Sequence, residues 1–538
     1  MLCKVFCACC KGLDPLTITV EVDVCDGISF FLVGLPDIAV KESQQRISSA
    51  LGRYGYRIPG KRIVVNLAPA NVKKEGSAFD VAIAMGIISA SGQATFPNPE
   101  DFLILGELAL DGSLRPVTGA LPIILHARDC GFKGCILPAE SAVEGAEIEG
   151  ITVFAAESVK DVIDILKEPE LAADKVVQYV GEGVGTGILC EGTGVLTGVV
   201  PADKGGALRV TVPGEKYVCD FADVKGQQPV KAGLEIAAAG GHNVIMVGSP
   251  GSGKTFMAKC VRSILPPMST QEAIETSKIY SVAGLFPAGG GLIRERPFRQ
   301  PHHTSTIQSL AGSGVYGLPG EISLAHNGVL FLDEFAEFSR SALEILRQPL
   351  EDRVIQICRA RTRFSYPASF MLVAAMNPCP CGYLYDQRVQ CTCSSSAVMK
   401  YASKISGPLM DRIDIQLNVA PVLAQDLLGD TASVEEPSCV IAARVAKARA
   451  VQLKRYAGEG FYSNAQIPPS LLQKYCKIGA EQKNYLMRIV SQLNISARGY
   501  SRILKISRTI ADLDGDDFIS LRHISKAIQF KLKINEDD

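Results

Sequence analysis

The stretch Gly248-Ser249-Pro250-Gly251-Ser252-Gly253-Lys254-Thr255 decides how the rest of the chain is interpreted. It fits the pattern G-x-x-x-x-G-K-[ST] of a phosphate-binding loop. The apolar run 243–247 before it predicts a strand and residues 256–261 after it predict a helix, which is the context that the motif requires. The glycines let backbone N–H groups turn toward phosphate oxygens, Lys254 adds a mobile positive charge, and the Thr255 hydroxyl is placed to bind Mg²⁺. The stretch therefore predicts a site for ATP and Mg²⁺.

Two later strands supply polar groups that such a loop requires. Residues 328–335 have the sequence Gly-Val-Leu-Phe-Leu-Asp-Glu-Phe, which predicts a buried parallel strand with carboxylates at its carboxyl end. We expect Asp333 to hold Mg²⁺ and Glu334 to polarise the attacking water. A third apolar run, 370–376, ends at Asn377, which we expect to hydrogen-bond the attacking water or the γ-phosphate. The alternative for this asparagine is a turn residue before a proline.

These motifs occur in the order found in AAA+ ATPases, and two arginine-bearing segments, 407–414 and 496–502, follow them. The chain resembles the magnesium-chelatase-like branch of that superfamily and, within it, the ComM/YifB family. The runs 296–303 and 377–382 are the more specific signatures. Residues 1–170 resemble the Lon-protease-type domain of the ribosomal-S5-like fold. The resemblance implies an α/β protein: an AAA+ P-loop core with a helical lid, preceded by a Lon/S5-like α+β domain.

The two arginine-bearing segments resemble parts of the ATPase site in ring-forming members. Arg412 would be an arginine finger that acts on the γ-phosphate bound to the neighbouring subunit. The alternative is a structural ion pair with Asp411 or Asp414. Arg498 resembles the sensor 2 arginine of the lid, and Arg502 is the second candidate for that role.

The family resemblance implies an ATP-hydrolysing homohexamer that acts on branched or single-stranded DNA. In that interpretation the protein is a branch-migration helicase in recombination and natural transformation. The alternative, taken from the magnesium-chelatase branch, is a motor that remodels a protein or a metal-insertion complex.

The Lon-like region is not predicted to be a protease. Ser77 falls near the nucleophile of the Ser–Lys dyad in Lon proteases, but Leu121 stands in the segment that looks like the lysine-bearing one. A serine without a base is a weak nucleophile. We therefore expect no peptidase activity, and we expect Ser77 to be a helix N-cap.

Length and composition indicate several globular domains. The chain of 538 residues is too long for one hydrophobic core. Its net charge of −1 means that any contact with nucleic acid depends on local basic clusters. We expect four regions: a Lon/S5-like N-terminal domain (1–170), a Gly-rich linker with a possible hairpin (171–215), the AAA+ core (216–425) and the helical lid (426–538).

The sequence predicts a cytoplasmic protein. The 17 cysteines are odd in number and scattered, which favours reduced thiols. The N-terminus lacks the long apolar core of a signal peptide. The most apolar segment, 78–90, is short and carries Asp80, so it predicts a buried helix and not a membrane span.

Basic residues form two clusters between the nucleotide motifs. The second cluster lies where residues 352–357 and 362–366 could pair as a hairpin. In a ring both clusters would face the pore and contact DNA phosphates, or they would form salt bridges between subunits. The two clusters are Arg294, Arg296 and Arg299, and Arg353, Arg359, Arg361 and Arg363.

Two further features have structural interpretations. His302 and His303 would lie on a strand and point to opposite faces, which disfavours a metal pair and favours hydrogen bonds within the insertion. Residues 437–456 predict a basic amphipathic helix, which we interpret as a solvated face of the lid.

Four cysteines lie in the loop after Asn377, at Cys379, Cys381, Cys391 and Cys393. Four thiols in a reducing compartment match a tetrahedral Zn²⁺ site that would pin this loop beside the nucleotide site. The C-x-C spacing is tighter than the usual C-x₂-C. Four free cysteines are the alternative.

Overall fold

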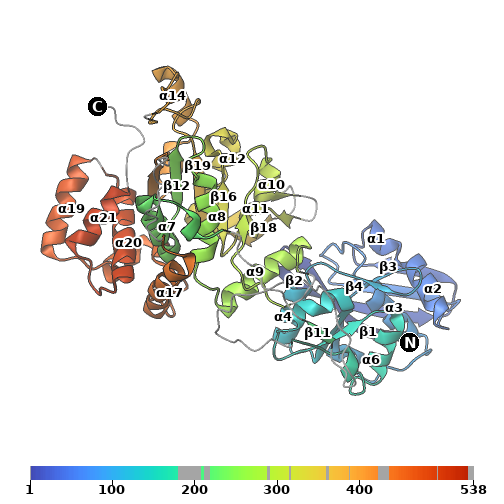
Figure 1. Cartoon of the computed structure of the whole chain (residues 1–538). Helices are drawn as coiled ribbons and strands as arrows, with labels where there is room; N and C mark the ends of the chain where they lie inside the picture. The colour runs from blue at the N-terminus through green and yellow to red at the C-terminus, as the bar shows by residue number, and fades with distance from the viewer. Residues whose placement is uncertain are drawn as a thin grey trace. The chain divides into compact units, whose positions relative to one another are not determined.

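The structure is a computed structural model that describes residues 2–179, 208–210, 219–287, 291–313, 317–358, 363–386, 388–421, 435–493 and 495–530. The chain divides into two compact units, which are described separately (Figure 1). The first unit comprises Met1–Glu215 and Ala273–Ile293, and the second comprises Lys216–Glu272 and Arg294–Asp538.

The predicted linker hairpin falls on residues 180–207 and 211–218, which lie outside the described residues. The described pieces of this segment are β10 (Val177–Tyr179) and β11 (Leu208–Val210). They pair in parallel.

The first unit is built on a mixed sheet with the strand order β3-β4-β2-β1-β5-β8-β9. Pairing is antiparallel between β1 and β2 and between β2 and β4, and parallel between the other neighbours. Residues 17–24, in which apolar and polar side chains alternate, lie inside β2, with Ile18, Val20 and Val22 buried. The strands are β1 (Leu2–Lys11), β2 (Asp14–Cys25), β3 (Ser29–Val33), β4 (Arg62–Ala68), β5 (Phe102–Ile104), β8 (Gly134–Pro138) and β9 (Thr152–Ala156).

Strand β1 is not predicted from the sequence. It forms a two-residue hairpin with β2, in which Lys11 pairs with Asp14 across the turn. Gly12 has φ +66°, as expected for the first turn residue of a tight hairpin. The hairpin places β1 in the middle of the sheet.

Helix α3 is buried on nearly its whole circumference. Ten of its eleven residues are buried, as expected for a helix that is apolar all round. Its glycine, Gly86, allows close packing, because a Cβ there would lie 2.6 Å from Val22. Its buried carboxylate, Asp80, is neutralised by Arg46 at 2.6 Å. The helices of this unit are α1 (Ile38–Lys41), α2 (Ser43–Arg53), α3 (Asp80–Ala90), α4 (Ala120–Asp129), α5 (Ala139–Ala142) and α6 (Val159–Lys167).

The expectation that Ser77 caps a helix is wrong. Phe79 is the N-cap residue of α3, and no side chain caps this helix. The Ser77 hydroxyl instead donates a hydrogen bond to Glu107 in the short strand β6 (Glu107–Leu108).

Residues 273–293, which include most of α9 (Thr270–Ala283), belong to the first unit although they follow the phosphate loop in sequence. Ala273 and Leu292 contribute to its core. The Ser281 hydroxyl donates to the buried carboxylate of Glu144 at 2.5 Å. The chain thus passes from the second unit into the first at Ala273 and returns to the second at Arg294.

The second unit contains a five-stranded sheet with the order β13-β16-β19-β12-β20, and every neighbouring pair is parallel. Parallel strands bring their carboxyl ends to one edge, where ligands bind in α/β folds. The strands are β12 (Val244–Gly248), β13 (Phe298–Arg299), β16 (Val329–Leu332), β19 (Met371–Met376) and β20 (Ile415–Val419). This parallel sheet and the mixed N-terminal sheet confirm the predicted fold class.

Short elements surround this sheet. The predicted hairpin is present as β17 (Val354–Cys358) and β18 (Arg363–Pro367), which pair antiparallel. A smaller ribbon pairs β14 (Gly312–Ser313) with β15 (Leu318–Pro319). The helices are α7 (Gln228–Gly240), α8 (Lys254–Ile264), α10 (Ile307–Ala311), α11 (Glu321–Leu324), α12 (Arg340–Glu344), α13 (Arg347–Asp352), α14 (Ser395–Ala402) and α15 (Gly407–Met410).

The C-terminal helices, orange to red in Figure 1, share one hydrophobic core with the sheet and α7. Leu234 of α7, Val445 of α17 and Ile503 of α20 are all buried in it. No helix in the described ranges is both long and apolar enough to cross a membrane. The C-terminal helices are α17 (Ser438–Arg455), α18 (Leu472–Tyr475), α19 (Ala480–Gln492), α20 (Ala497–Asp514) and α21 (Leu521–Gln529).

The basic residues of α17 do not form a simple solvated face. Arg444 pairs with Glu235 of α7 at 2.6 Å, and Arg455 pairs with Asp512 of α20 at 2.6 Å. The interpretation as a solvated face fits exposed Lys447 and Lys454, but it misses the partners of Arg444 and Arg455 in α7 and α20, which lie more than fifty residues away in the sequence. These ion pairs attach α17 to its neighbouring helices.

Candidate nucleotide-binding site

The phosphate loop connects the end of β12 to the start of α8. Gly251 and Gly253 have φ angles of +74° and +88°, and a Cβ at either position would meet no atom within 4 Å. Glycine is favoured here by backbone conformation and not by crowding. The loop ends at the N-terminus of α8, where free backbone N–H groups favour an anion.

Lys254 is folded back onto its own loop. Its Nζ donates to the carbonyl oxygens of Gly248 at 2.7 Å and Ser249 at 2.9 Å, and it lies 3.3 Å from Asn377 Oδ1. Burial lowers the pKa of this ammonium group, while the charge of Asp333 opposes the shift. The side chain is therefore satisfied internally and is positioned to reach a phosphate.

Thr255 and Asp333 lie in direct contact. Thr255 Oγ1 donates to Asp333 Oδ2 at 2.7 Å. The threonine is in the first turn of α8, and the aspartate follows the buried strand β16. A hydroxyl beside a carboxylate is a ligand set that suits Mg²⁺, so these residues fit the ion that the motif implies.

Glu334 follows with a left-handed backbone, φ +51°. Its N–H donates to Asp333 Oδ1 at 2.9 Å. His303 Nδ1 lies 2.9 Å from Glu334 Oε2, at hydrogen-bonding distance. The expectation that the two histidines lie on a strand is wrong: they lie in a loop and turn after β13, and their rings stack with centroids 4.1 Å apart.

Asn377 directly follows β19, the strand between β12 and β16. Its contact with Lys254 places its amide beside the phosphate loop. The structure thus brings together Lys254, Thr255, Asp333 and Asn377 at one edge of the sheet. Their catalytic roles remain predictions.

The two predicted catalytic arginines meet at Glu351 of α13. Arg498 Nη2 donates to Glu351 Oε1 at 2.9 Å, and Arg412 donates to the other oxygen, Oε2. The alternative in which Arg412 pairs with Asp411 or Asp414 is wrong.

Asp414 instead accepts the Asn243 N–H at 3.1 Å and lies 3.6 Å from Arg502. Arg502, the second candidate for sensor 2, therefore has a different acidic neighbour from the other two arginines.

The first basic cluster does not form a row of phosphate ligands. Arg296 pairs with Glu272 at 3.0 Å, and Arg299 pairs with Glu321 at 2.6 Å, both inside the second unit. Contact of these two residues with DNA or with a neighbouring subunit stays a prediction. In the second cluster, Arg359 and Arg361 lie outside the described residues, while Arg363 is exposed on β18.

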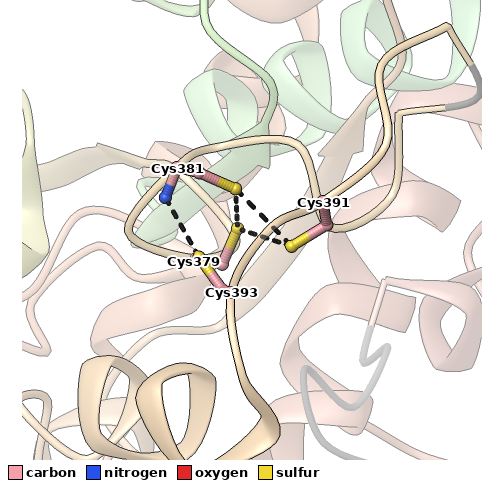
Figure 2. A group of neighbouring side chains, drawn as sticks. All are labelled: Cys379, Cys381, Cys391 and Cys393. Carbon is pink, nitrogen blue, oxygen red and sulfur yellow. Dashed lines mark hydrogen bonds between the residues drawn. The ribbon is translucent and has the colours of Figure 1, made fainter.

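The four loop cysteines converge, as Figure 2 shows. All four sulfur atoms lie within 4.8 Å of one another. They are brought together by two turns of the loop between β19 and α14. Thiols gathered in this way can bind a metal ion.

Sequence reasoning does not predict three polar contacts of this region. These are the contact of His303 with Glu334, that of Glu351 with the two arginines, and that of Asp386 with Ser249 of the phosphate loop. Of these residues, only His303 lies in a recognisable sequence run, Pro301-His302-His303. The two acids lie at exposed or loop positions that no motif marks.

Comparison with known proteins gives matches along the whole chain. Three family models match: "Magnesium chelatase, subunit ChlI" over residues 220–427, "Subunit ChlI of Mg-chelatase" over 20–141, and "Magnesium chelatase, subunit ChlI C-terminal" over 435–531.

Curated relatives agree with these models. Competence protein ComM of Haemophilus influenzae is 38% identical over 524 residues, which cover 97% of this chain and 96% of that protein. The uncharacterized protein YifB of Salmonella typhimurium is 36% identical over 521 residues, 97% of this chain and 95% of that protein. The DNA replication licensing factor mcm-6 of Caenorhabditis briggsae is 23% identical over 345 residues, 59% of this chain and 38% of that protein. The near full-length identity to ComM and YifB shows that the chain belongs to the ComM/YifB family of magnesium-chelatase-like AAA+ ATPases.

Proposed function

We propose that the chain is the subunit of a homohexameric, ATP-hydrolysing motor on branched DNA, a branch-migration helicase in recombination and natural transformation. The observation that best supports ATP hydrolysis is the contact of Thr255 with Asp333, beside Lys254 and Asn377. Bound MgATP supplies the γ-phosphoryl group whose transfer to water drives the motor.

The residues of one subunit bind and orient the nucleotide. Lys254 exchanges its two loop carbonyls for phosphate oxygens, and the N-terminus of α8 adds backbone N–H donors. Thr255 and Asp333, which lie in contact, would supply oxygen ligands to Mg²⁺. Glu334 leaves His303 and accepts a proton from the attacking water, which Asn377 orients.

The arginines couple the site to the ring. We propose that Arg412 reaches the γ-phosphate of the neighbouring subunit and that Arg498 reaches that of its own subunit. In the described structure both guanidinium groups contact Glu351, and we propose that they turn from this carboxylate toward the γ-phosphate when ATP is bound. The positive charge of Arg412 reaches a γ-phosphate only when two subunits lie side by side. Hydrolysis therefore depends on assembly of the ring.

The proposal that the motor acts on DNA is supported by the names of two relatives and by one surface hairpin. One relative is named a competence protein and another a DNA replication licensing factor. Within the chain, the β17–β18 hairpin carries exposed Arg363, and we propose that this hairpin contacts DNA phosphates in the pore. We further propose a cytoplasmic location without membrane contact, and a Zn²⁺ ion in the cysteine loop.

A second candidate function is a motor that remodels a protein or a metal-insertion complex. It is favoured by the family models, all three of which describe magnesium-chelatase subunit ChlI. Such a motor requires a dedicated protein partner and does not require DNA.

The test is strand displacement on forked and four-way-junction DNA by the full chain. We expect wild-type protein with ATP to separate the strands and Glu334→Gln to bind the DNA without moving it. Arg363→Ala should weaken DNA binding and leave ATP binding intact, with exposed Arg57→Ala as the matched control. Absence of strand movement by an ATP-hydrolysing wild type would contradict the helicase.

A further inference from the structure

The cysteine loop has the dimensions of a tetrahedral metal site. The Sγ–Sγ distances are 3.4 Å from Cys379 to Cys381, 3.7 Å from Cys379 to Cys391 and 3.5 Å from Cys381 to Cys391. A tetrahedron of thiolates at the usual Zn–S length has sulfur atoms about 3.8 Å apart. A disulfide requires sulfur atoms about 2.05 Å apart, so the described separations fit a shared ion and not a disulfide.

The backbone around these sulfurs supports thiolates. The N–H of Cys381 donates to Cys393 Sγ at 3.4 Å. Donors of this kind orient metal ligands and spread the negative charge of a thiolate cluster. The two C-x-C segments therefore present the four ligands, and one of them adds a backbone hydrogen bond to a ligand sulfur (Figure 2).

The same loop lies directly against the phosphate loop. Gly382 lies so close to Pro250 that a Cβ there would meet Pro250 Cδ at 2.6 Å and Cγ at 2.7 Å. Asp386, four residues further on, pairs with Arg388 at 2.9 Å and also interacts with Ser249, which helps to lower the pKa of its carboxyl. The loop also begins at Asn377, which contacts Lys254. Three contacts thus join the cysteine loop to the nucleotide site.

We propose that Cys379, Cys381, Cys391 and Cys393 bind one Zn²⁺, and that the ion braces the phosphate loop through Gly382 and Asp386. Without the ion, four thiols in a loop of irregular backbone have little to hold them together, and Pro250 and Ser249 lose a fixed neighbour. The metal is structural, since four protein thiolates complete its coordination and leave no position for substrate. The bracing role rests on the proposed ATPase function, whereas the metal site does not.

The first test is the metal content of the full chain, purified without a metal-affinity tag. We expect one zinc per chain in the wild type and less than about a tenth in the Cys381→Ser/Cys391→Ser variant. Cys439→Ser, an exposed cysteine of the second unit outside the loop, is the matched control and should keep its zinc. Cobalt added to metal-free protein should give the absorption of tetrahedral thiolate coordination. Well under one zinc per chain in the wild type, or full zinc in the double variant, overturns the site.

The second test measures ATP affinity with and without zinc. Removal of the ion from wild-type protein should raise the Kd for ATP about tenfold, and added Zn²⁺ should restore it. Asp386→Ala should keep one zinc per chain and bind ATP about fivefold more weakly, the effect of one lost hydrogen bond. Unchanged ATP affinity after zinc removal overturns the brace. Absence of ATP binding by fully zinc-loaded protein would instead contradict the proposed function.

Discussion

Arg412 and Arg498 donate to the two oxygens of one carboxylate, that of Glu351. Arg412 comes from the turn before β20 and Arg498 from the first turn of α20. Their side chains differ in exposure, 12% for Arg412 and 55% for Arg498. One acid therefore holds both of the arginines that we assign to the γ-phosphate, and it keeps them close together between the core and the C-terminal helices.

If Arg412 acts on the neighbouring subunit, two inactive variants should complement each other. Arg412→Ala should lower kcat for ATP hydrolysis about 10³–10⁵-fold. Lys254→Ala should abolish hydrolysis by loss of nucleotide binding. A mixed ring should regain activity in about a quarter of its sites, because each site then needs two different subunits side by side. Mixtures that stay as inactive as the separate variants would place the arginine in its own subunit's site.

The contact of His303 with Glu334 should restrain the basal rate. Because a hydrogen bond to a charged group is worth about 1.5–3 kcal/mol, His303→Ala should release Glu334 and raise the DNA-independent ATPase rate about tenfold. His302→Ala is the control, since His302 bonds to Thr304 and not to Glu334. A His303→Ala rate as low as that of Glu334→Gln would show that the histidine assists hydrolysis.

Glu144 should make the first unit less stable as pH rises. Burial raises the pKa of this carboxyl from 4.5 to about 7, against hydrogen bonds from Ser281 and the Leu121 N–H. The folded form then holds its proton more tightly than the unfolded form, so stability is full below pH about 4.5 and falls as pH rises toward 7. Glu144→Gln should therefore stabilise the unit at pH 8 by on the order of 3 kcal/mol, and by less than about 1 kcal/mol at pH 5.

Hydrogen exchange of α4 at the two pH values measures this difference. Glu140→Gln, an exposed acid in the same unit, is the control and should show no such dependence. Equal stabilisation by Glu144→Gln at pH 5 and pH 8 would argue against the raised pKa.

The first unit should lack peptidase activity. Ser77 donates to Glu107, and Leu121 is fully buried, so neither position offers a serine with a basic partner. Incubation of the full chain with casein and ATP should give no cleavage. Cleavage that disappears in Ser77→Ala, and persists in a Ser113→Ala control, would show that the first unit is an active peptidase.

The sequence predicts the nucleotide strands well because their signals are local. The loop from Gly248 to Thr255, the run ending at Asp333 and the run ending at Asn377 each combine an apolar strand with a polar end, and the parallel sheet brings these ends together. Strand β1 could not be predicted because both of its faces carry apolar side chains. Its buried positions include Cys3 and Cys7, while Leu2 and Phe6 lie on the other face, so polar and apolar residues do not alternate in the sequence.

Long-range partners could not be predicted in the same way. The helical pattern of α9 does not say which core it joins, and its residues from Ala273 onward lie in the first unit. Likewise, nothing near Glu351 in the sequence indicates that two arginines, one 61 and one 147 residues away, will share its carboxylate. Such pairs are specified by the folded arrangement of several segments.

The most direct test of the proposed function is the ATPase rate of the full chain with and without four-way-junction DNA, measured beside Glu334→Gln. We predict that the junction raises the wild-type rate several-fold and that the variant hydrolyses almost no ATP in either condition. A wild type that hydrolyses ATP at the same rate with and without junction DNA, and does not bind it, would contradict the DNA motor and favour a motor that acts on a protein partner.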